Sequence, residues 1–272
     1  MRLSPVPGPG RLVGVDPATA GWRYLAFEVW ALPAGATWQL ETGPEEAVLV
    51  FLTGSARATV EGQTFEIVGR RRVFTALPTA LYLPRASRLD LTATTALEFA
   101  LGRAPAERRY PVRLVRPEAV RVEIRGGANV TRRVSHVLAP DFPAERLLVV
   151  EVLTPSGNWS SFPPHRHDGR GGSPYLEEVY YYRIDPPEGF ALQRLYTRDT
   201  ARDEVVVARD SDLVLVPEGY HPVVAAPGSN VYYLNILAGE TREMTPYDDP
   251  AYAWIRQDWH GRALTLPITA TH

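Results

Sequence analysis

Short apolar runs separated by Gly, Pro and Asp dominate this chain of 272 residues. Several of them alternate with period two, the spacing at which side chains share one face of a strand. Proline accounts for 25 residues, well above its usual share, and interior prolines disfavour long helices. The pattern predicts an all-β sandwich or barrel. The main predicted strands are 25–31, 47–52, 56–60, 64–67, 147–153, 179–184, 190–196, 205–208, 213–216 and 231–237.

Two local features add to this pattern. Residues 56–60 and 64–67 flank Glu61-Gly62-Gln63, which predicts a hairpin. The only helix that the sequence predicts is a short one near Asp249 to Asp258, with Pro250 just inside its start.

The two halves of the chain resemble each other, which indicates an internal duplication. Glu46 precedes Pro84 by 38 positions, and Glu178 precedes Pro217 by 39. We therefore predict two domains, 1–110 and 111–272, joined near an Arg- and Pro-rich stretch. The matching segments are Leu32 to Trp38 with Thr154 to Trp159, Glu45 to Val48 with Glu177 to Tyr180, and Tyr82 to Pro84 with Leu215 to Pro217.

Two residue types are missing, and their absence narrows the possible chemistry. The chain has no cysteine, which excludes thiol nucleophiles, thiolate metal sites and disulfides. All 29 basic residues are arginine, which excludes Schiff-base and P-loop lysines. The net charge of -2 does not favour a nucleic-acid partner, and no apolar stretch is long enough for a membrane span. We expect a soluble cytoplasmic protein without nucleic-acid or membrane partners.

The histidines indicate a metal site in the second half. His165 and His167 are two residues apart, so in an extended segment both imidazoles point to the same side. Glu178 opens the next predicted strand, and His221 lies where a later strand ends in a turn. Three imidazoles and one carboxylate suit one divalent ion of Zn, Mn, Fe or Ni. The remaining histidines, which we interpret as surface or core residues, are His136, His260 and His272.

The order His-x-His, Glu and a distant His resembles the cupin signature, and it implies a bicupin of two tandem β-barrels with few short helices. At the position of His221 the first half has Arg88, and it has no histidine, so that barrel is expected to lack metal. Glu46 is interpreted as a relic of the ligand carboxylate or as a surface residue. Bicupins often pair through strand edges, so the resemblance implies that this chain forms a homodimer or a larger homo-oligomer.

Longer blocks are similar to the 5-deoxy-glucuronate isomerases of inositol catabolism. The resemblance implies an aldose–ketose isomerase that converts 5-deoxy-glucuronate, a small sugar acid, into 5-dehydro-2-deoxy-gluconate. The Gly-rich, arginine-bearing loop between His167 and Tyr175 departs from the family pattern. The blocks that carry the resemblance are 157–168, 176–183, 216–222 and 232–235.

Such an isomerisation moves a proton between neighbouring carbons through an enediol. A metal would polarise the carbonyl, and a base would carry the proton. Tyr180 and Tyr182 share the face of Glu178 and are the candidate catalytic residues, although both could equally be aromatic core. Arginine is expected to bind the substrate carboxylate, but the sequence does not indicate which one.

Three alternative functions remain open from the sequence. The first is a 5-keto-4-deoxyuronate isomerase of pectin breakdown, which uses a similar ligand set. The second is an iron-dependent cupin dioxygenase. The third is a non-catalytic bicupin that binds sugar.

Overall fold

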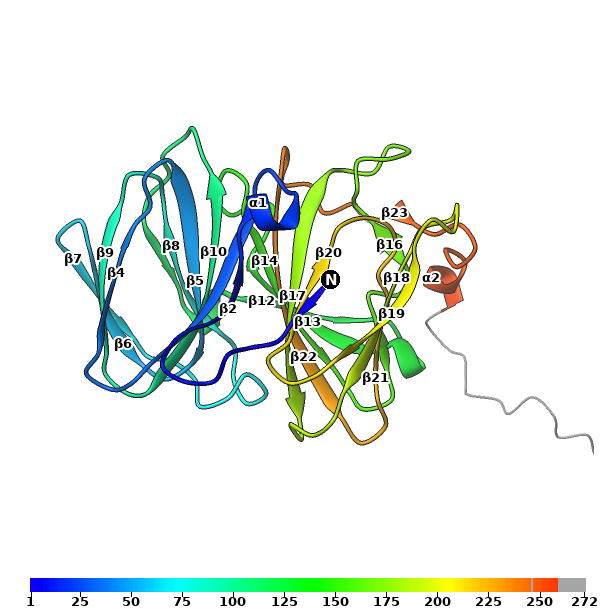
Figure 1. The fold of residues 1–272 in the computed structure, drawn as a ribbon, viewed down its shortest axis with the longest axis horizontal. Helices are drawn as coiled ribbons and strands as arrows, with labels where there is room; N and C mark the ends of the chain where they lie inside the picture. The colour runs from blue at the N-terminus through cyan, green and yellow to red at the C-terminus, as the bar shows by residue number, and fades with distance from the viewer. Residues whose placement is uncertain (246, 259–272) are drawn as a thin grey trace, which may run out of the picture.

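A computed structural model describes residues 1–245 and 247–258. The chain folds into two β-sandwiches placed side by side, each with one large and one small antiparallel sheet. Figure 1 shows the large sheets next to each other in the middle of the molecule and the small sheets on the outside. This arrangement confirms the predicted all-β fold class.

The N-terminal sandwich encloses a core of Leu, Val, Phe and Ala side chains from both of its sheets. The large sheet has the order β11 (Arg113–Val115), β8 (Thr79–Leu83), β5 (Glu45–Thr53), β10 (Leu97–Pro105), β3 (Ala26–Leu32), β2 (Gly10–Val15). The small sheet has the order β4 (Thr37–Glu41), β9 (Arg88–Ala93), β6 (Ala56–Val60), β7 (Gln63–Ile67).

The C-terminal sandwich repeats this arrangement. Its large sheet has the order β1 (Arg2–Leu3), β20 (Leu213–Val216), β17 (Leu176–Asp185), β22 (Asn230–Gly239), β14 (Leu148–Thr154), β13 (Arg132–Leu138), β12 (Arg121–Arg125). The small sheet has the order β15 (Trp159–Ser160), β21 (Val223–Ala225), β18 (Ala191–Tyr196), β19 (Asp203–Ala208). A separate pair joins β16 (His165–Arg166) to β23 (Tyr247–Asp248).

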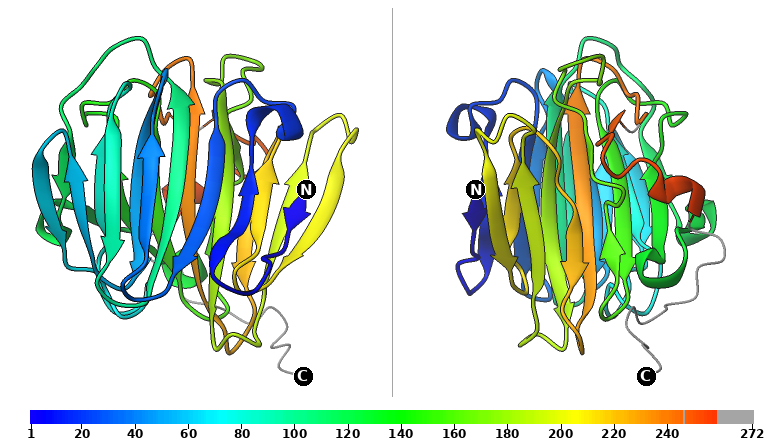
Figure 2. Two further views of the ribbon diagram at one scale, coloured as in Figure 1. Left: turned by 60° about the vertical axis from the view of Figure 1, so that its left-hand side comes forward. Right: turned by 90° about the vertical axis from the view of Figure 1, so that its right-hand side faces the viewer.

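The halves are tied together by packing and by exchanged strands. The largest apolar core lies between the two large sheets, where Phe27 and Val50 of one half meet Tyr181 and Ile236 of the other. β1 leaves the N-terminal half to pair with β20, so the N-terminus lies beside the yellow strands of the other half (Figure 2). β11 follows residue 110 in the chain but pairs with β8 of the N-terminal half.

Turns and helices follow local rules. The predicted hairpin is confirmed: β6 and β7 are joined through Glu61 and Gly62, whose positive φ angles of 51° and 78° suit a tight hairpin turn. The predicted helix is shorter than expected, because turns occupy 250–254 and only α2 (Ile255–Asp258) is helical.

Three further short elements are not predicted by the sequence analysis. α1 forms where Asp16 caps the backbone N–H of Thr19 and Gly21 ends the helix with a left-handed backbone. The three elements are α1 (Pro17–Ala20), η1 (Pro117–Ala119) and η2 (Ala128–Val130).

In the described residues no helix is long and apolar enough to cross a membrane.

Candidate metal centre

β17 brings Glu178 into the C-terminal sandwich. Because side chains alternate along a strand, Glu178, Tyr180 and Tyr182 face the inside of this sandwich. Val179 and Tyr181 face the opposite way and pack against the N-terminal half. Glu178 lies opposite Leu237 of β22 and Val216 of β20, near one end of the large sheet.

Two loops bring the imidazoles to Glu178. The backbone N–H of Leu176 donates to the carbonyl of His167 over 2.8 Å, which fixes the His-x-His segment against the start of β17. His221 follows a turn in which Gly219 has a φ of +78°. The Asp168 carboxylate accepts the backbone N–H of Gly219 over 3.1 Å, and this contact connects the two loops.

One ligand atom from each of His167, Glu178 and His221 lies within 4.8 Å of the other two. The Oε2 atom of Glu178 lies 2.9 Å from Nε2 of His167 and 3.3 Å from Nε2 of His221. His165 stands beside this group, with its ring centroid 4.8 Å from that of His221. The structure therefore brings three of the four predicted ligands together and places the fourth next to them, and the assignment as ligands stays a prediction.

Backbone carbonyls determine how each imidazole is protonated. The Nδ1 atoms of His165, His167 and His221 lie 3.2, 2.8 and 3.1 Å from carbonyl oxygens. A carbonyl only accepts, so in a neutral imidazole Nδ1 carries the proton and Nε2 keeps a lone pair. In the neutral His221 this lone pair faces the Glu178 carboxylate, and its Nε2 has no hydrogen-bond partner among the described residues. Nε2 of His167 faces the same carboxylate oxygen. A shared cation would resolve this repulsion, so the residues fit a divalent metal.

The pKa values are consistent with imidazoles that can act as ligands. Burial, reinforced by nearby imidazoles, lowers the pKa of His165 and of His221 to about 3, so both are neutral at pH 7. Burial opposes protonation of His167 as well, but the Glu178 carboxylate outweighs it and raises the pKa of that imidazole. In the absence of metal, a proton between His167 and Glu178 would take part of the cation's place.

The two candidate tyrosines differ in their surroundings. The hydroxyl of Tyr180 lies 2.9 Å from Oγ of Ser161, and its ring lies 5.8 Å from that of His221. Burial raises the pKa of Tyr180 well above 10, so its hydroxyl stays protonated. Tyr182 donates to Oε1 of Gln193 over 2.8 Å, deeper in the sandwich. Tyr180 therefore lines a recess beside Glu178, whereas Tyr182 belongs to the core.

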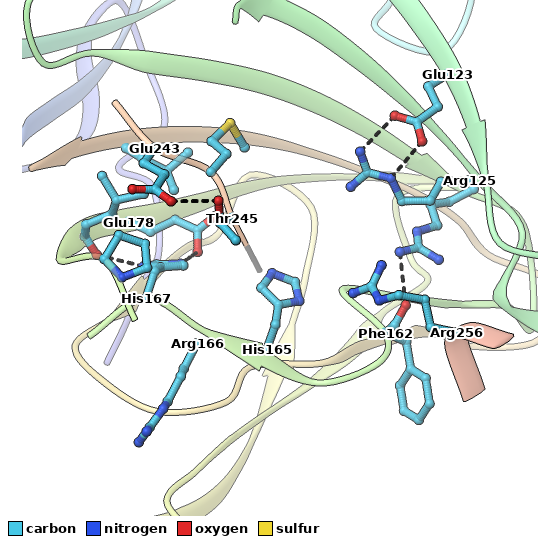
Figure 3. A pocket seen from close by; sticks show the side chains of 15 residues that line it. Glu123, Arg125, Phe162, His165, Arg166, His167, Glu178, Glu243, Thr245 and Arg256 are labelled. Carbon is cyan, nitrogen blue, oxygen red and sulfur yellow. Dashed lines mark hydrogen bonds and ion pairs between the residues drawn. The ribbon is translucent and has the colours of Figure 1, made fainter. Parts of the chain in front are cut away.

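A cavity of about 300 Å³ opens next to the histidines and Glu178. Figure 3 shows His167, Glu178 and Glu243 on one side of it and Arg125 and Arg256 on the other. The sequence analysis did not single out the arginines or Glu243, because they come from distant segments without a spacing motif. The cavity-lining residues that it missed are Glu123, Arg125, Arg132, Glu243, Thr245 and Arg256.

The N-terminal sandwich shows no counterpart of this cluster in its described residues. Strand pairing places Ala47 opposite Leu83 and Arg103, as Glu178 is placed opposite Val216 and Leu237. Ala47, and not Glu46, is therefore the counterpart of Glu178. The interpretation of Glu46 as a relic ligand or a surface residue is wrong: Glu46 is fully buried and accepts three backbone N–H groups of residues 145–147.

The structure describes one of the three histidines that we interpret as surface or core residues. His136 lies on β13 and its imidazole is 3.4 Å from Glu123, and its pKa is lowered by burial. His260 and His272 lie outside the described residues.

Comparison with solved structures confirms the fold. A crystal structure of an IolB-like protein from Salmonella typhimurium superposes with a TM-score of 0.91 at 39% identity, covering 93% of this chain and 98% of that chain. Oxalate decarboxylase from Lactobacillus farciminis superposes with a TM-score of 0.64 at 13% identity, over 88% of this chain and 86% of its own. The second likeness shows the fold alone, which is the predicted two-barrel cupin fold.

Sequence comparison identifies the family. The KduI/IolB family model matches residues 5–255. Relatives from Geobacillus thermodenitrificans and Bacillus subtilis, both named 5-deoxy-glucuronate isomerase, are 45% and 40% identical to this chain. The alignments cover 91% and 89% of this chain and 92% and 91% of the two relatives. The chain therefore belongs to the KduI/IolB family and is an isomerase.

Proposed function

We propose that this isomerase is metal-dependent and converts 5-deoxy-glucuronate into 5-dehydro-2-deoxy-gluconate. The observation that carries the metal is the convergence of the Nε2 atoms of His167 and His221 on the Glu178 carboxylate. A divalent ion bound by His165, His167, Glu178 and His221 would polarise the substrate carbonyl and stabilise an enediolate. Zn, Mn and Fe all suit this set of ligands.

The residues of the cavity supply the proton chemistry. Three carboxylates line it: Glu123 is bonded to Arg125, Glu178 faces the imidazoles, and Glu243 accepts from Thr245 over 2.8 Å. Glu243 is therefore the candidate base that takes the proton from one carbon and returns it to the next. The protonated hydroxyl of Tyr180 is suited to donate a hydrogen bond to an oxygen that gains charge.

The choice of substrate rests on the two relatives reported above, which are 45% and 40% identical and carry the name 5-deoxy-glucuronate isomerase. A substrate panel tests it. We expect turnover of 5-deoxy-glucuronate to exceed that of 5-keto-4-deoxyuronate by at least about 100-fold in kcat/KM. The opposite preference would assign the chain to pectin breakdown, and oxygen consumption with bound iron would indicate a dioxygenase.

Two substitutions separate the metal from the base. Glu178→Gln should remove the bound metal, measured by elemental analysis, and lower turnover by about 100-fold or more. Glu243→Gln should keep the metal and lower kcat by about 100-fold. Proton NMR of the isomerisation, with metal stripped and restored, provides the activity measurement. Full activity of rigorously metal-free protein would contradict the metal dependence.

A further inference from the structure

Three guanidinium groups lie together on the cavity wall opposite Glu178. Arg125 comes from β12, Arg132 from β13 and Arg256 from α2, so three separate segments contribute to one wall. Figure 3 shows Arg125 and Arg256 on this side, with His165 between them and the side of His167 and Glu178. The cavity thus has a candidate metal end and an arginine end.

Arg132 is the most enclosed of the three. Its residue is only 5% exposed, and it donates from Nη1 to the carbonyl of Val130 over 2.9 Å and from Nη2 to that of Phe162 over 3.0 Å. These two contacts hold the guanidinium plane between η2 and the segment before His165. A buried guanidinium with a fixed orientation needs little reorganisation to bind an anion.

The neighbouring charges favour an anion at this wall. Arg125 forms two hydrogen bonds with Glu123, and Arg256 forms two with Asp248, so these side chains are themselves held in place. Burial, assisted by the positive charges of Arg125 and Arg256, lowers the pKa of Arg132 to about 10. A carboxylate bound here would be attracted chiefly by Arg132, since Glu123 and Asp248 already balance its two neighbours. In a partly dry cavity this attraction is stronger than in water.

We infer that Arg132, flanked by Arg125 and Arg256, binds the carboxylate of the substrate and so selects sugar acids over neutral sugars. The inference rests on the proposed function, because it places the carbonyl of the same substrate at the other end of the cavity. A guanidinium can bind both oxygens of one carboxylate, which fixes the direction of the bound sugar. The cavity volume of about 300 Å³ lies at the lower end of the range for small-molecule sites.

The test compares two substrates in two variants. The substrates are 5-deoxy-glucuronate and the matching neutral 5-deoxy-hexose, in which a hydroxymethyl group replaces the carboxylate. Arg132→Met should lower kcat/KM for the acid by about 100-fold, mainly through KM, and change that for the hexose less than about threefold. Arg133→Met is the matched control, because Arg133 follows on the same strand and lines a different hollow. The control should keep the preference for the acid.

A binding measurement separates this inference from the proposed function. Calorimetry with gluconate, and elemental analysis of the metal, are carried out on the metal-loaded wild type and on Arg132→Met. Loss of gluconate binding with metal content unchanged supports the anion site even if the wild type isomerises neither sugar. An unchanged preference for the acid in Arg132→Met, with gluconate binding intact, would overturn the inference.

A second variant tests the same inference if Arg132→Met does not fold. Arg256 lies near the chain's last described residues and its side chain is 38% exposed, so its replacement should disturb the sandwich less. Arg256→Met should lower kcat/KM for the acid by about fivefold while that for the hexose is unchanged. Equal effects on the two substrates would also contradict the inference that these arginines bind the substrate carboxylate.

Discussion

At the scale of single residues, the hydroxyl contacts of Tyr180 and Tyr182 assign them different roles. Both are fully buried and lie on the same face of β17. Tyr180 contacts Ser161 at the recess beside Glu178, whereas Tyr182 contacts Gln193 on the small sheet. The same face of a strand therefore borders the candidate site at one residue and belongs to the core two residues later.

Removal of each hydroxyl should separate the two roles. We expect Tyr180→Phe to lower kcat about fivefold, the equivalent of one hydrogen bond. Tyr182→Phe should leave kcat unchanged and lower the free energy of unfolding by about 1–2 kcal/mol, because Oε1 of Gln193 loses its donor in a buried site. Steady-state kinetics and urea denaturation of both variants make the comparison. A larger kinetic effect for Tyr182→Phe would reverse the assignment.

The predicted ligands illustrate what residue spacing can and cannot reveal. The approach of His165 and His167 to one point beside His221 was predictable, because two residues in an extended segment point the same way. The carbonyl oxygens that orient the imidazoles belong to any residue type and leave no mark in the sequence. Arg132 was equally hidden among the 29 arginines, since only the fold shows which of them face the cavity.

At the scale of elements, the turn before His221 determines where that imidazole lies. Gly219 has a φ of +78°, and a Cβ atom there would lie 2.4 Å from the carbonyl oxygen of Tyr196. The carbonyl of Gly219 also accepts the Nδ1 proton of His221 over 3.1 Å. The glycine is therefore required both by its backbone conformation and by the close approach of a neighbouring strand.

Replacement of this glycine should loosen the proposed metal site without a change at any predicted ligand. Gly219→Ala should weaken metal binding by about 10-fold or more and lower the free energy of unfolding by about 2 kcal/mol. Gly157→Ala is the control: its φ is +76°, but nothing lies within 4 Å of the added Cβ. It should cost about 1 kcal/mol and leave metal affinity unchanged. Metal titration and thermal unfolding measure both quantities.

Strand positions were predictable from alternation, but the register between the halves was not. Leu25, Phe27 and Val29 alternate in the sequence and do face one core. The match of Glu46 with Glu178 was off by one residue, and a shift of one residue moves a side chain to the other face of a strand. Glu46 corresponds to Glu177, and neighbouring glutamates in both halves concealed the difference.

At the scale of the whole molecule, two buried glutamates connect the halves in a reciprocal way. Glu46 of β5 accepts the backbone N–H groups of residues 145–147, which lead into β14. Glu177 of β17 accepts those of residues 23–25, which lead into β3. Each half thus supplies one carboxylate to the strand entry of the other, and we expect the two halves to unfold as one unit.

Loss of one such carboxylate should destabilise both halves together. In Glu46→Ala three backbone N–H groups lose their acceptor at a buried site, which we expect to lower the free energy of unfolding by about 3 kcal/mol or more. Glu45→Ala is the control, because the Glu45 side chain is partly exposed and, among the described residues, bonds Arg103 alone, a contact worth about 1 kcal/mol or less. Glu46 does not line the cavity beside the proposed metal site, so metal content should not change. Guanidinium denaturation, followed by circular dichroism and by tryptophan fluorescence, should give one shared transition shifted to lower denaturant. If Glu46→Ala is as stable as Glu45→Ala, the glutamate contacts do not hold the two sandwiches together, and the apolar core between the large sheets alone accounts for their cohesion.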